Sequence, residues 1–341
     1  MLAACTGKMS GTGGGSSSGG GSAGGGGMSM GGGAGGGGGG ATGAGDGHLN
    51  SLDPAAMAQS AFKLPLDAAL SPDGKTAYFI ALDVDQNPTV FTVAASGGTP
   101  AVLASGDPLA APFGIDTSTD GSKLVLADSS ALDGNGLDHG CLFTLGTAAA
   151  GAPSQLASTV GYQPRSVVIV QESGNDVAYF TGHDATDHAP GVFKVSLGGG
   201  AVSVVAKGMG FNDPSGLAVA ADGTVYLADA IAEESGHAQL LKVSGGTVSA
   251  VIADMTVGYP AGVALSKDET AALVSALDPS TGTDIVIRYD LMANTQSAFS
   301  TGIDTFSESA GLKRARNVDT FVWADSHANG GGTVYIVNKQ P

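Results

Sequence analysis

Histidines and carboxylates share the same polar stretches of this chain. Of its six histidines, five lie near aspartates or glutamates in stretches that separate short apolar segments. These five are His139, His183, His188, His237 and His327. Carboxylate oxygens alone suit calcium, whereas mixed nitrogen and oxygen ligands suit zinc or another transition metal. The residue types therefore allow a metal site or a polar ligand site, if the fold gathers these stretches at one place.

A second set of polar residues precedes apolar segments that are expected to be strands. As candidate ligand-binding residues we take Tyr162, Arg165, Asn212, Asp213, Tyr259 and Glu308. As candidate metal ligands we take Asn212, Asp213, Glu308 and Asp83. The alternative is that these loops are polar because they are solvated, and that their carboxylates stabilise turns. No catalytic residue is assigned, because no Ser-His-Asp or Cys-His arrangement has a supporting spacing.

The elements that would position these residues come from an internal repeat. The stretch from Asp213 to Asp229 contains an apolar segment, an Asp-Gly turn and a second apolar segment. Similar stretches follow six anchor residues at spacings of 47, 52, 50, 46 and 49. The anchors are Pro65, Pro112, Pro164, Pro214, Pro260 and Ser309. This period, with short strands and no helical pattern, predicts an all-β six-bladed β-propeller of four-stranded antiparallel blades.

The sixth repeat offers three strands, and a ring keeps two open sheet edges unless its first and last blades are joined. We expect residues 56–64 to supply the missing strand, although this segment can also be interpreted as the end of a linker. In such blades, the loops from second to third strand and the loops into the first strand emerge on one face. The fold would therefore bring the candidate residues to one end of the propeller axis.

Recurrence separates structural residues from functional ones. Asp128, Asp229 and Asp325 recur after the second strand of their repeats, which favours a structural role in the turn. A departure from a repeat is where a function would show. The candidates that depart from it are Arg165, Asn212, Asp213 and Glu308.

The repeats resemble a known group of propellers. The motifs that carry the resemblance are residues 214–229 (PSGLAVAADGTVYLAD) and residues 70–78 (LSPDGKTAY). They resemble the NHL-repeat and gluconolactonase (senescence marker protein) group of six-bladed propellers, over nearly all of residues 64–337. These motifs are the skeleton of many propellers, so they specify the architecture rather than an activity.

The resemblance also implies a metal site. Gluconolactonase-like propellers hold a divalent cation on the axis with a Glu, Asn and Asp set, and the ion polarises an ester carbonyl. Here Glu308 and Asn212 would stand in such a set, with Asp213 or Asp83 completing it. The sequence departs from that pattern in two places. The Glu of those enzymes opens the first blade, whereas Glu308 opens the last, and Asn212 is followed by Asp rather than Gly.

The N-terminal residues predict a tether. Residues 2–5 (LAAC) resemble the lipobox of a bacterial lipoprotein, with Cys5 as the acylated residue. The charged and apolar regions that usually precede a lipobox are absent, so either the start codon is mis-set or the match is coincidence. Residues 7–52 are rich in Gly and Ser and bury too little apolar surface to fold, so we expect a flexible linker. The expected organisation is a lipobox remnant at 1–6, the linker at 7–52 and the propeller at 53–341. A lipid anchor would place the protein on the bacterial outer membrane, facing the periplasm or the cell surface.

Composition limits the partners. A net charge of −17 with only 14 Lys and Arg argues against nucleic acid and anionic lipid, which require a cationic footprint. No stretch is apolar for long enough to span a bilayer, so contact with a membrane would be through the lipid alone. Cys141 lies on an expected strand and should be a buried apolar group, and two cysteines exclude a disulfide framework.

Our leading hypothesis is an envelope-tethered, monomeric propeller that binds a partner protein or a small ligand at the axial face. One alternative is a metal-dependent hydrolase of the lactonase type, with calcium or zinc as its cofactor. A second alternative is a scaffold without a ligand site. Convergence of the non-recurring candidates at the axis would favour a site, and their scattering would favour the scaffold.

Overall fold

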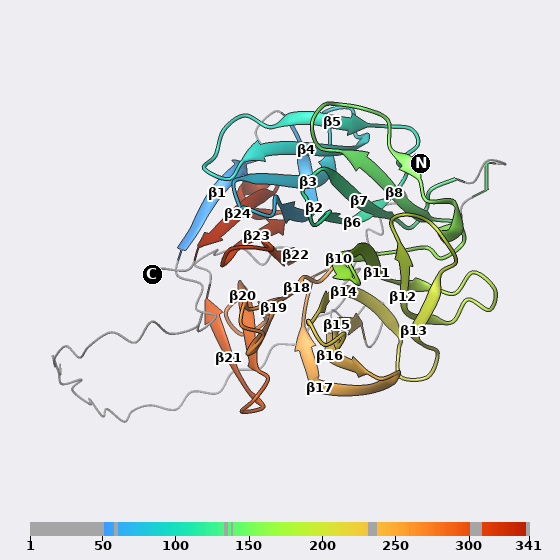
Figure 1. Cartoon of the computed structure of the whole chain (residues 1–341). Coiled ribbons are helices and arrows are strands. Elements are labelled where there is room, and N and C mark those ends of the chain that lie inside the picture. The colour runs from blue at the N-terminus through green and yellow to red at the C-terminus, as the bar shows by residue number, and fades with distance from the viewer. Residues whose placement is uncertain are drawn as a thin grey trace, which may run out of the picture. The chain divides into compact units, whose positions relative to one another are not determined.

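The computed structural model describes residues 51–57, 61–132, 136–137, 139–230, 237–258, 260–300 and 309–338. Strands dominate these residues and form six four-stranded antiparallel sheets (Figure 1), each of which is one blade. The predicted fold class is confirmed. No helix among the described residues is long and apolar enough to cross a membrane.

The bounds of the strands follow the repeat. Blade 1 consists of β2 (Lys63–Leu70), β3 (Thr76–Leu82), β4 (Pro88–Ala94) and β5 (Ala101–Ser105). Blade 2 consists of β6 (Pro112–Thr117), β7 (Lys123–Asp128), β8 (Cys141–Gly146) and β9 (Ser154–Gln155). Blade 3 consists of β10 (Ser166–Glu172), β11 (Asn175–His183), β12 (Pro190–Ser196) and β13 (Ser203–Lys207). Blade 4 consists of β14 (Asp213–Val219), β15 (Val225–Ala230), β16 (His237–Ser244) and β17 (Thr247–Thr256). Blade 5 consists of β18 (Val263–Leu265), β19 (Ala271–Asp278), β20 (Thr283–Asp290) and β21 (Thr295–Ser300). Blade 6 consists of β22 (Ser309–Arg314), β23 (Thr320–Asp325), β24 (Thr333–Asn338) and β1 (Ser51–Met57).

The first strand of each blade is its innermost strand. Each innermost strand contacts the next one along the chain, from β2 through β6, β10, β14 and β18 to β22, and β22 contacts β2. The six sheets therefore form a closed ring around one axis (Figure 1).

Blade 6 is closed by a strand from the N-terminal side of the propeller, as predicted. β1 pairs antiparallel with β24, with Leu52 opposite Val337 and Met57 opposite Thr333. The bounds differ from the expected residues 56–64. The later part of that segment already belongs to the innermost strand of blade 1, where Lys63 pairs with Leu82.

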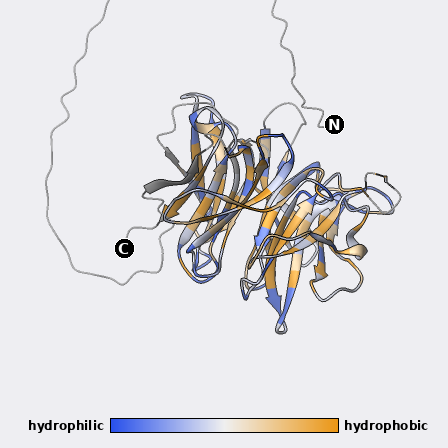
Figure 2. Cartoon of the chain, turned by 90° about the horizontal axis from the view of Figure 1, so that it is seen from above, coloured by the Kyte–Doolittle hydropathy of each residue, from blue (hydrophilic) through white to orange (hydrophobic). Residues whose placement is uncertain are grey.

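Apolar side chains fill the spaces between adjacent blades. Phe62, Phe79 and Phe91 of blade 1 cluster with buried residues of blade 6, and equivalent clusters lie between the other neighbouring blades. Figure 2 shows hydrophobic residues along the strands of these sheets. Cys141 is fully buried in one cluster, as predicted, and burial raises the pKa of its thiol to about 11.

In blades 1, 2 and 5, a serine and an aspartate fix the hairpin turn between the first and second strands. In blade 2, the Ser118 hydroxyl donates to Asp120 Oδ1 at 2.7 Å and accepts from the Lys123 N–H at 2.9 Å. The pKa of Asp120 is lowered to about 2 by the hydroxyl of Ser118 and by the N–H and hydroxyl of Ser122. The same pairing recurs in blades 1 and 5, as Ser71 with Asp73 and Ser266 with Asp268.

The innermost strands approach each other so closely that some positions accept only glycine. A Cβ at Gly216 would lie 1.8 Å from the carbonyl oxygen of Ala261, and a Cβ at Gly262 would lie 1.9 Å from the backbone nitrogen of Leu312. Both glycines lie two residues after their anchors. The equivalent residue in blade 1 is Asp67. Blade 1 therefore has a charged side chain at a position where four other blades have glycine.

Candidate functional site

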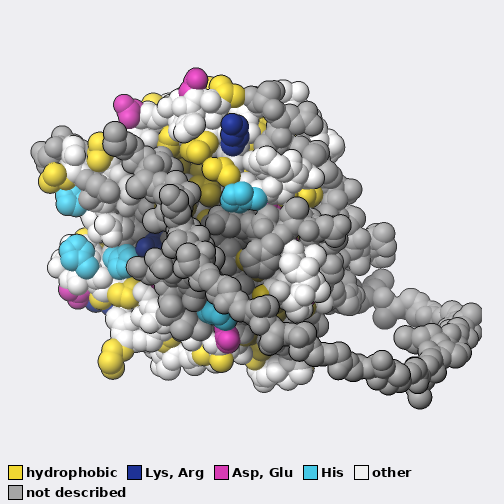
Figure 3. Space-filling view, turned by 180° about the vertical axis from the view of Figure 1, so that it is seen from behind, with side chains coloured by type: hydrophobic (Ala, Val, Ile, Leu, Met, Phe, Trp, Pro, Cys, Tyr) yellow, Lys and Arg dark blue, Asp and Glu magenta, His cyan; other side chains and the backbone are white. Residues whose placement is uncertain are grey.

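Two of the predicted site residues meet at the loop end of the axis, where the loops into the innermost strands lie. Arg165, before β10, and Asp213, at the start of β14, form an ion pair from Nη1 to Oδ1 between blades 3 and 4. Burial, followed by the charge of Arg165, lowers the pKa of the neighbouring His183, so this imidazole is neutral near pH 7. Figure 3 shows several histidine side chains on one face of the molecule.

The recurring aspartates of this end have the structural role that was predicted. Buried Asp128 accepts hydrogen bonds from the N–H groups of Ala110, Ala111 and Ser130, at 2.8 to 3.1 Å. Asp229 accepts from the N–H of Asn212 at 2.9 Å. These carboxylates hold the loops that lead into the innermost strands.

Asp325 acts within its own loop, where Oδ1 accepts from the N–H of His327 and of Ala328 at 3.0 and 2.8 Å. Burial raises the pKa of Asp128 and of Asp229, and the hydrogen bonds from the backbone oppose the rise.

The other candidates serve local contacts or lie outside the described residues. Asn212 also donates from Nδ2 to Asp229. The ring of Tyr162 packs edge-on against Phe180 and Phe193, with centroids 5.9 and 5.1 Å away. Asp83 accepts from Asp85 and Asn87 of its own loop and from Ser105 at the end of the outermost strand. Tyr259, Glu308 and Cys5 lie outside the described residues.

A metal site would need several ligands at one point. Among the residues that the structure describes, no group of three or more His, Cys, Asp or Glu side chains could hold a metal ion. The predicted set of Asn212, Asp213, Asp83 and Glu308 therefore stays a prediction, since it depends on Glu308.

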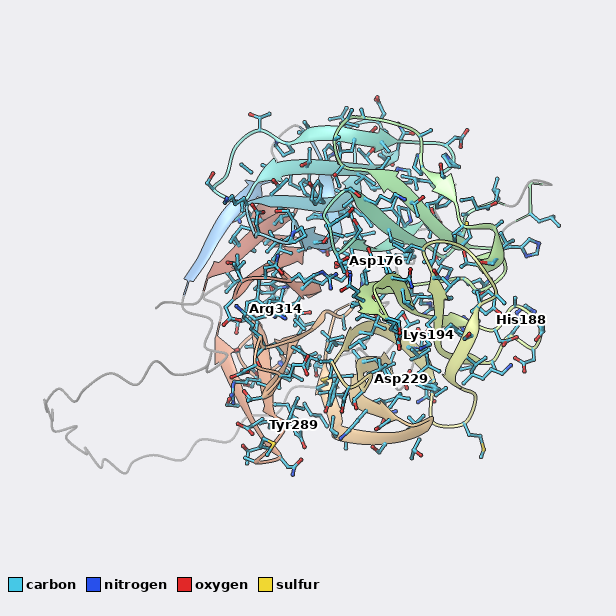
Figure 4. All side chains as sticks on the ribbon, in the orientation of Figure 1. Asp176, His188, Lys194, Asp229, Tyr289 and Arg314 are labelled. Carbon is cyan, nitrogen blue, oxygen red and sulfur yellow. The ribbon has the colours of Figure 1, made fainter. Side chains whose placement is uncertain are left out.

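A cavity of about 110 Å³ lies on the axis at the opposite end of the propeller. It is lined by residues 116–117 of β6, 168–170 of β10, 217–219 of β14, 263–265 of β18 and 313–314 of β22, and by Arg316. Most of these residues lie toward the ends of the innermost strands that lead into the hairpin turns, and we call this the hairpin end. Figure 4 shows Arg314 beside the centre of the ring.

A buried ion pair crosses the channel behind this cavity. Lys313 of blade 6 donates to Asp67 Oδ2 of blade 1 and to the carbonyl oxygen of Ile115 in blade 2. Asp67 Oδ2 also accepts from the N–H of Ile115 at 2.9 Å. The side chains of Lys313 and Asp67 are 8% and 4% exposed. Burial raises the pKa of Asp67, and the ammonium of Lys313 opposes that rise.

A second layer of polar contacts crosses the channel at the cavity itself. Asp116 of β6 accepts from the N–H of Ile169 in β10 at 2.6 Å. Arg316 donates from Nη2 to the carbonyl oxygens of Ile169 and Thr117, at 2.8 and 3.3 Å. Arg314 donates from Nε to the carbonyl oxygen of Leu265 at 2.9 Å. Charged side chains thus bind individual edge groups of β6, β10 and β18.

The edge of β14 differs from these three. Ile115 lies three residues after its anchor and Thr117 five, and their counterparts in β14 are Leu217 and Val219. By this equivalence, the backbone groups of Leu217 and Val219 face the cavity. Across the described chain, no hydrogen bond from outside blade 4 reaches residues 217–219. The cavity therefore offers backbone donors and acceptors next to cationic side chains.

The sequence contains a signal for this site, in the innermost strands rather than in the loops where the candidates were sought. Four residues after each anchor the chain has Ala69, Asp116, Val168, Ala218, Ala264 and Lys313. Asp116 and Lys313 are the only charged residues at this position of the repeat. Two residues after each anchor, the only charged residue is Asp67. The rule that a departure from a repeat marks function applies to innermost strands as well as to loops.

The fold and the axial site define the class of protein as a six-bladed β-propeller with a polar axial channel. No family profile matches the sequence, and no curated protein matches it. Its structure is similar to a gluconolactonase from Xanthomonas campestris, with 14% identity and a TM-score of 0.56, over 85% of this chain and 98% of that chain.

Two further similarities are of the same kind. A chain of the nidogen/laminin complex has 19% identity and a TM-score of 0.55, over 74% of this chain and 84% of that one. A putative TolB from Agrobacterium tumefaciens has 14% identity and a TM-score of 0.52, over 82% and 91%. The expected likeness to gluconolactonase-like propellers is thus confirmed for the fold, which is what identities of this size establish.

Proposed function

We propose that this protein is a binding propeller that captures a small molecule in the cavity at the hairpin end of its axis. The observation that carries the proposal is the uncapped edge of β14, which faces a cavity of about 110 Å³ beside Arg316. By contrast, Asp67 and Lys313 bind edge groups of β6, and Asp116 binds an edge group of β10. Backbone groups without such a partner bind water or a ligand, because leaving them unpaired is costly.

The structurally similar propellers support binding as a function, but they do not assign a ligand to this protein. One similar propeller belongs to a nidogen/laminin complex, and another is a gluconolactonase. The lactonase alternative requires Glu308, which lies outside the described residues. Binding at the hairpin end uses only residues whose contacts are known.

The test is to locate small-molecule binding by NMR on the full chain. A panel of small polar metabolites is titrated while backbone amide resonances are followed by transverse-relaxation-optimised spectra. We expect a ligand to shift the amides of residues 217–219 and 263–265 and to leave Arg165 and Asp213 unchanged. Shifts confined to the loop end, or none across the panel, would contradict the proposal.

We also propose that the protein is tethered to the bacterial envelope through Cys5. The proposal rests on the LAAC motif at residues 2–5 and the Gly-rich stretch that follows it. In a bacterial host that processes lipoproteins, the full chain should incorporate labelled palmitate and fractionate with membranes. The Cys5→Ala variant should lose both properties, and incorporation that persists in this variant would refute the tether.

A further inference from the structure

Two carboxylates of the protein itself, those of Asp67 and Asp116, bind strand edges in the axial channel. The carboxylate of Asp67 accepts the edge N–H of Ile115 at 2.9 Å and also the ammonium of Lys313. The carboxylate of Asp116 accepts the edge N–H of Ile169 at 2.6 Å, and the carbonyl of that same residue accepts from Arg316. In both cases an innermost strand donates its N–H to a carboxylate, and a cation from residues 313–316 lies close by.

Blade 4 has the same edge without the carboxylate. In blade 2, the residue four positions after the anchor is Asp116, and its carboxylate reaches the edge of β10 in the next blade. A carboxylate that reached the edge of β14 would come from the same position in blade 3. In blade 3 that position is Val168, which has no acceptor. The edge N–H of Val219, the counterpart of Ile169, is therefore not reached by a carboxylate from its neighbour. The cavity lies at this point, lined by residues 168–170 and 217–219.

A cationic side chain, that of Arg316, lines the same cavity. Arg316 uses Nη2 for the carbonyls of Thr117 and Ile169, while its buried Nε has no hydrogen-bond partner among the described residues. A guanidinium with a spare donor is a strong partner for a carboxylate, because the hydrogen bond is charge-assisted. The chain has only 14 Lys and Arg, and three of them lie at positions 313, 314 and 316 beside this cavity.

We propose that the axial cavity binds a small free carboxylate, which accepts from the β14 edge as Asp116 accepts from the β10 edge, with Arg316 as its cationic partner. This inference rests on the proposed function and names the ligand class for the same site. A cavity of 150 Å³ accepts benzene, so one of about 110 Å³ suits roughly four or five non-hydrogen atoms. Acetate and propionate are of that size.

The first experiment compares matched small ligands on the full chain by NMR titration at constant ionic strength. Acetate should bind with a Kd of about 1 mM, and no tighter than about 40 μM given the ceiling on binding energy per atom for a ligand of four non-hydrogen atoms. Acetamide has the same shape without the charge, and it should bind at least tenfold more weakly. Equal binding of acetamide, or tighter binding of inorganic phosphate than of acetate, would overturn the inference.

Two variants test the geometry. Val168→Asp supplies a carboxylate from within the chain, and it should abolish acetate binding because it occupies the ligand's place; Val168→Thr keeps the shape without the charge and should bind normally. Arg316→Met should weaken acetate binding about tenfold or more, whereas Arg165→Met at the loop end should not. Melting curves show whether each variant folds.

The outcomes separate this inference from the proposed function. Acetate binding that survives both Val168→Asp and Arg316→Met would overturn the inference. So would a panel in which acetate fails to bind but another small molecule shifts the amides of residues 217–219. In that second case the proposed binding site would stand, and only its ligand class would be wrong.

Discussion

The two ends of the propeller axis use charged residues in different ways. At the loop end, the carboxylates of Asp128 and Asp229 accept N–H groups of the loops that lead into the innermost strands, and Asp325 accepts N–H groups of its own loop. At the hairpin end, Lys313 and Arg316 reach across the channel to other blades. An abundance of polar residues therefore does not mark the site. The hairpin end has fewer of them, but they surround a cavity and a strand edge that no side chain caps.

Substitution of Lys313 should lower the free energy of unfolding more than any other change considered, because its ion pair with Asp67 is the most buried charge pair described on the axis. Lys313→Met leaves the carboxylate of Asp67 without its cation and should lower the free energy of unfolding by about 3–5 kcal/mol in urea at pH 7. The double variant Asp67→Asn with Lys313→Met removes both charges and should recover much of that loss.

The same variant should depend on pH in a definite direction. Without Lys313, the pKa of Asp67 in the folded protein rises further above its usual value of 3.8. The folded state then binds more protons than the unfolded state, so stability should fall as pH rises from about 4 through the raised pKa. A loss below 1 kcal/mol that does not vary with pH would show that the pair does not hold the channel.

Asp128 should give the next largest effect, since it represents the structural use of carboxylates at the loop end. Asp128→Ala leaves the N–H groups of Ala110, Ala111 and Ser130 without their acceptor and should cost about 3 kcal/mol in urea unfolding. Asp128→Asn keeps one acceptor oxygen and should cost about half as much. A negligible cost for Asp128→Ala would weaken the distinction between the two ends.

The pair of Arg165 and Asp213 should contribute less, because both side chains are partly exposed, at 23% and 19%. A double-mutant cycle with alanine at each position should give a coupling energy of about 1 kcal/mol or less in urea unfolding. A coupling of several kcal/mol would place a buried, structurally important charge pair at the loop end, and the contrast with Lys313 would be lost.

The smallest effect concerns the hairpin turns that border the cavity. Ser118→Ala removes the hydroxyl that donates to Asp120, so the pKa of Asp120 should rise from about 2 toward its usual value of 3.8, as measured by carboxyl carbon NMR. Because the pKa is lowered in the folded protein, the stability that Asp120 contributes is present above about pH 4. It should be lost as pH falls through about 2.

Ser71→Ala is the matched control, because it should shift Asp73 and leave Asp120 unchanged. An unchanged titration of Asp120 in Ser118→Ala would mean that the serine does not fix this turn.

The repeat predicted the fold because blade structure is local. Short apolar strands recur in each repeat and Asp-Gly turns in three of them, so six anchors were enough to count the blades. Outermost strands were harder to predict. β9 spans only Ser154–Gln155, and β21 (Thr295–Ser300) is largely polar, so neither has an apolar pattern. The closing strand was expected at 56–64 and lies at Ser51–Met57, because pairing across the ring has no local signal.

The candidate site was predicted less well, for a physical reason. Convergence of the non-recurring candidates was the criterion for a site, and of these Arg165 and Asp213 form an ion pair. The charged residues of the channel were visible as departures from the repeat, but their partners are in other blades. Lys313 and Asp67 are 246 residues apart in sequence. Only the closed ring brings them together, so no spacing within a repeat could reveal the contact.

A crystal structure of the full chain, grown or soaked with propionate, would test the carboxylate site at the hairpin end most directly. We predict carboxylate density in the cavity, with its oxygens about 2.8–3.0 Å from the backbone nitrogen of Val219 and from the guanidinium group of Arg316. Density for the ligand at the loop end beside Arg165, or a hairpin-end cavity filled by ordered water alone, would contradict this prediction.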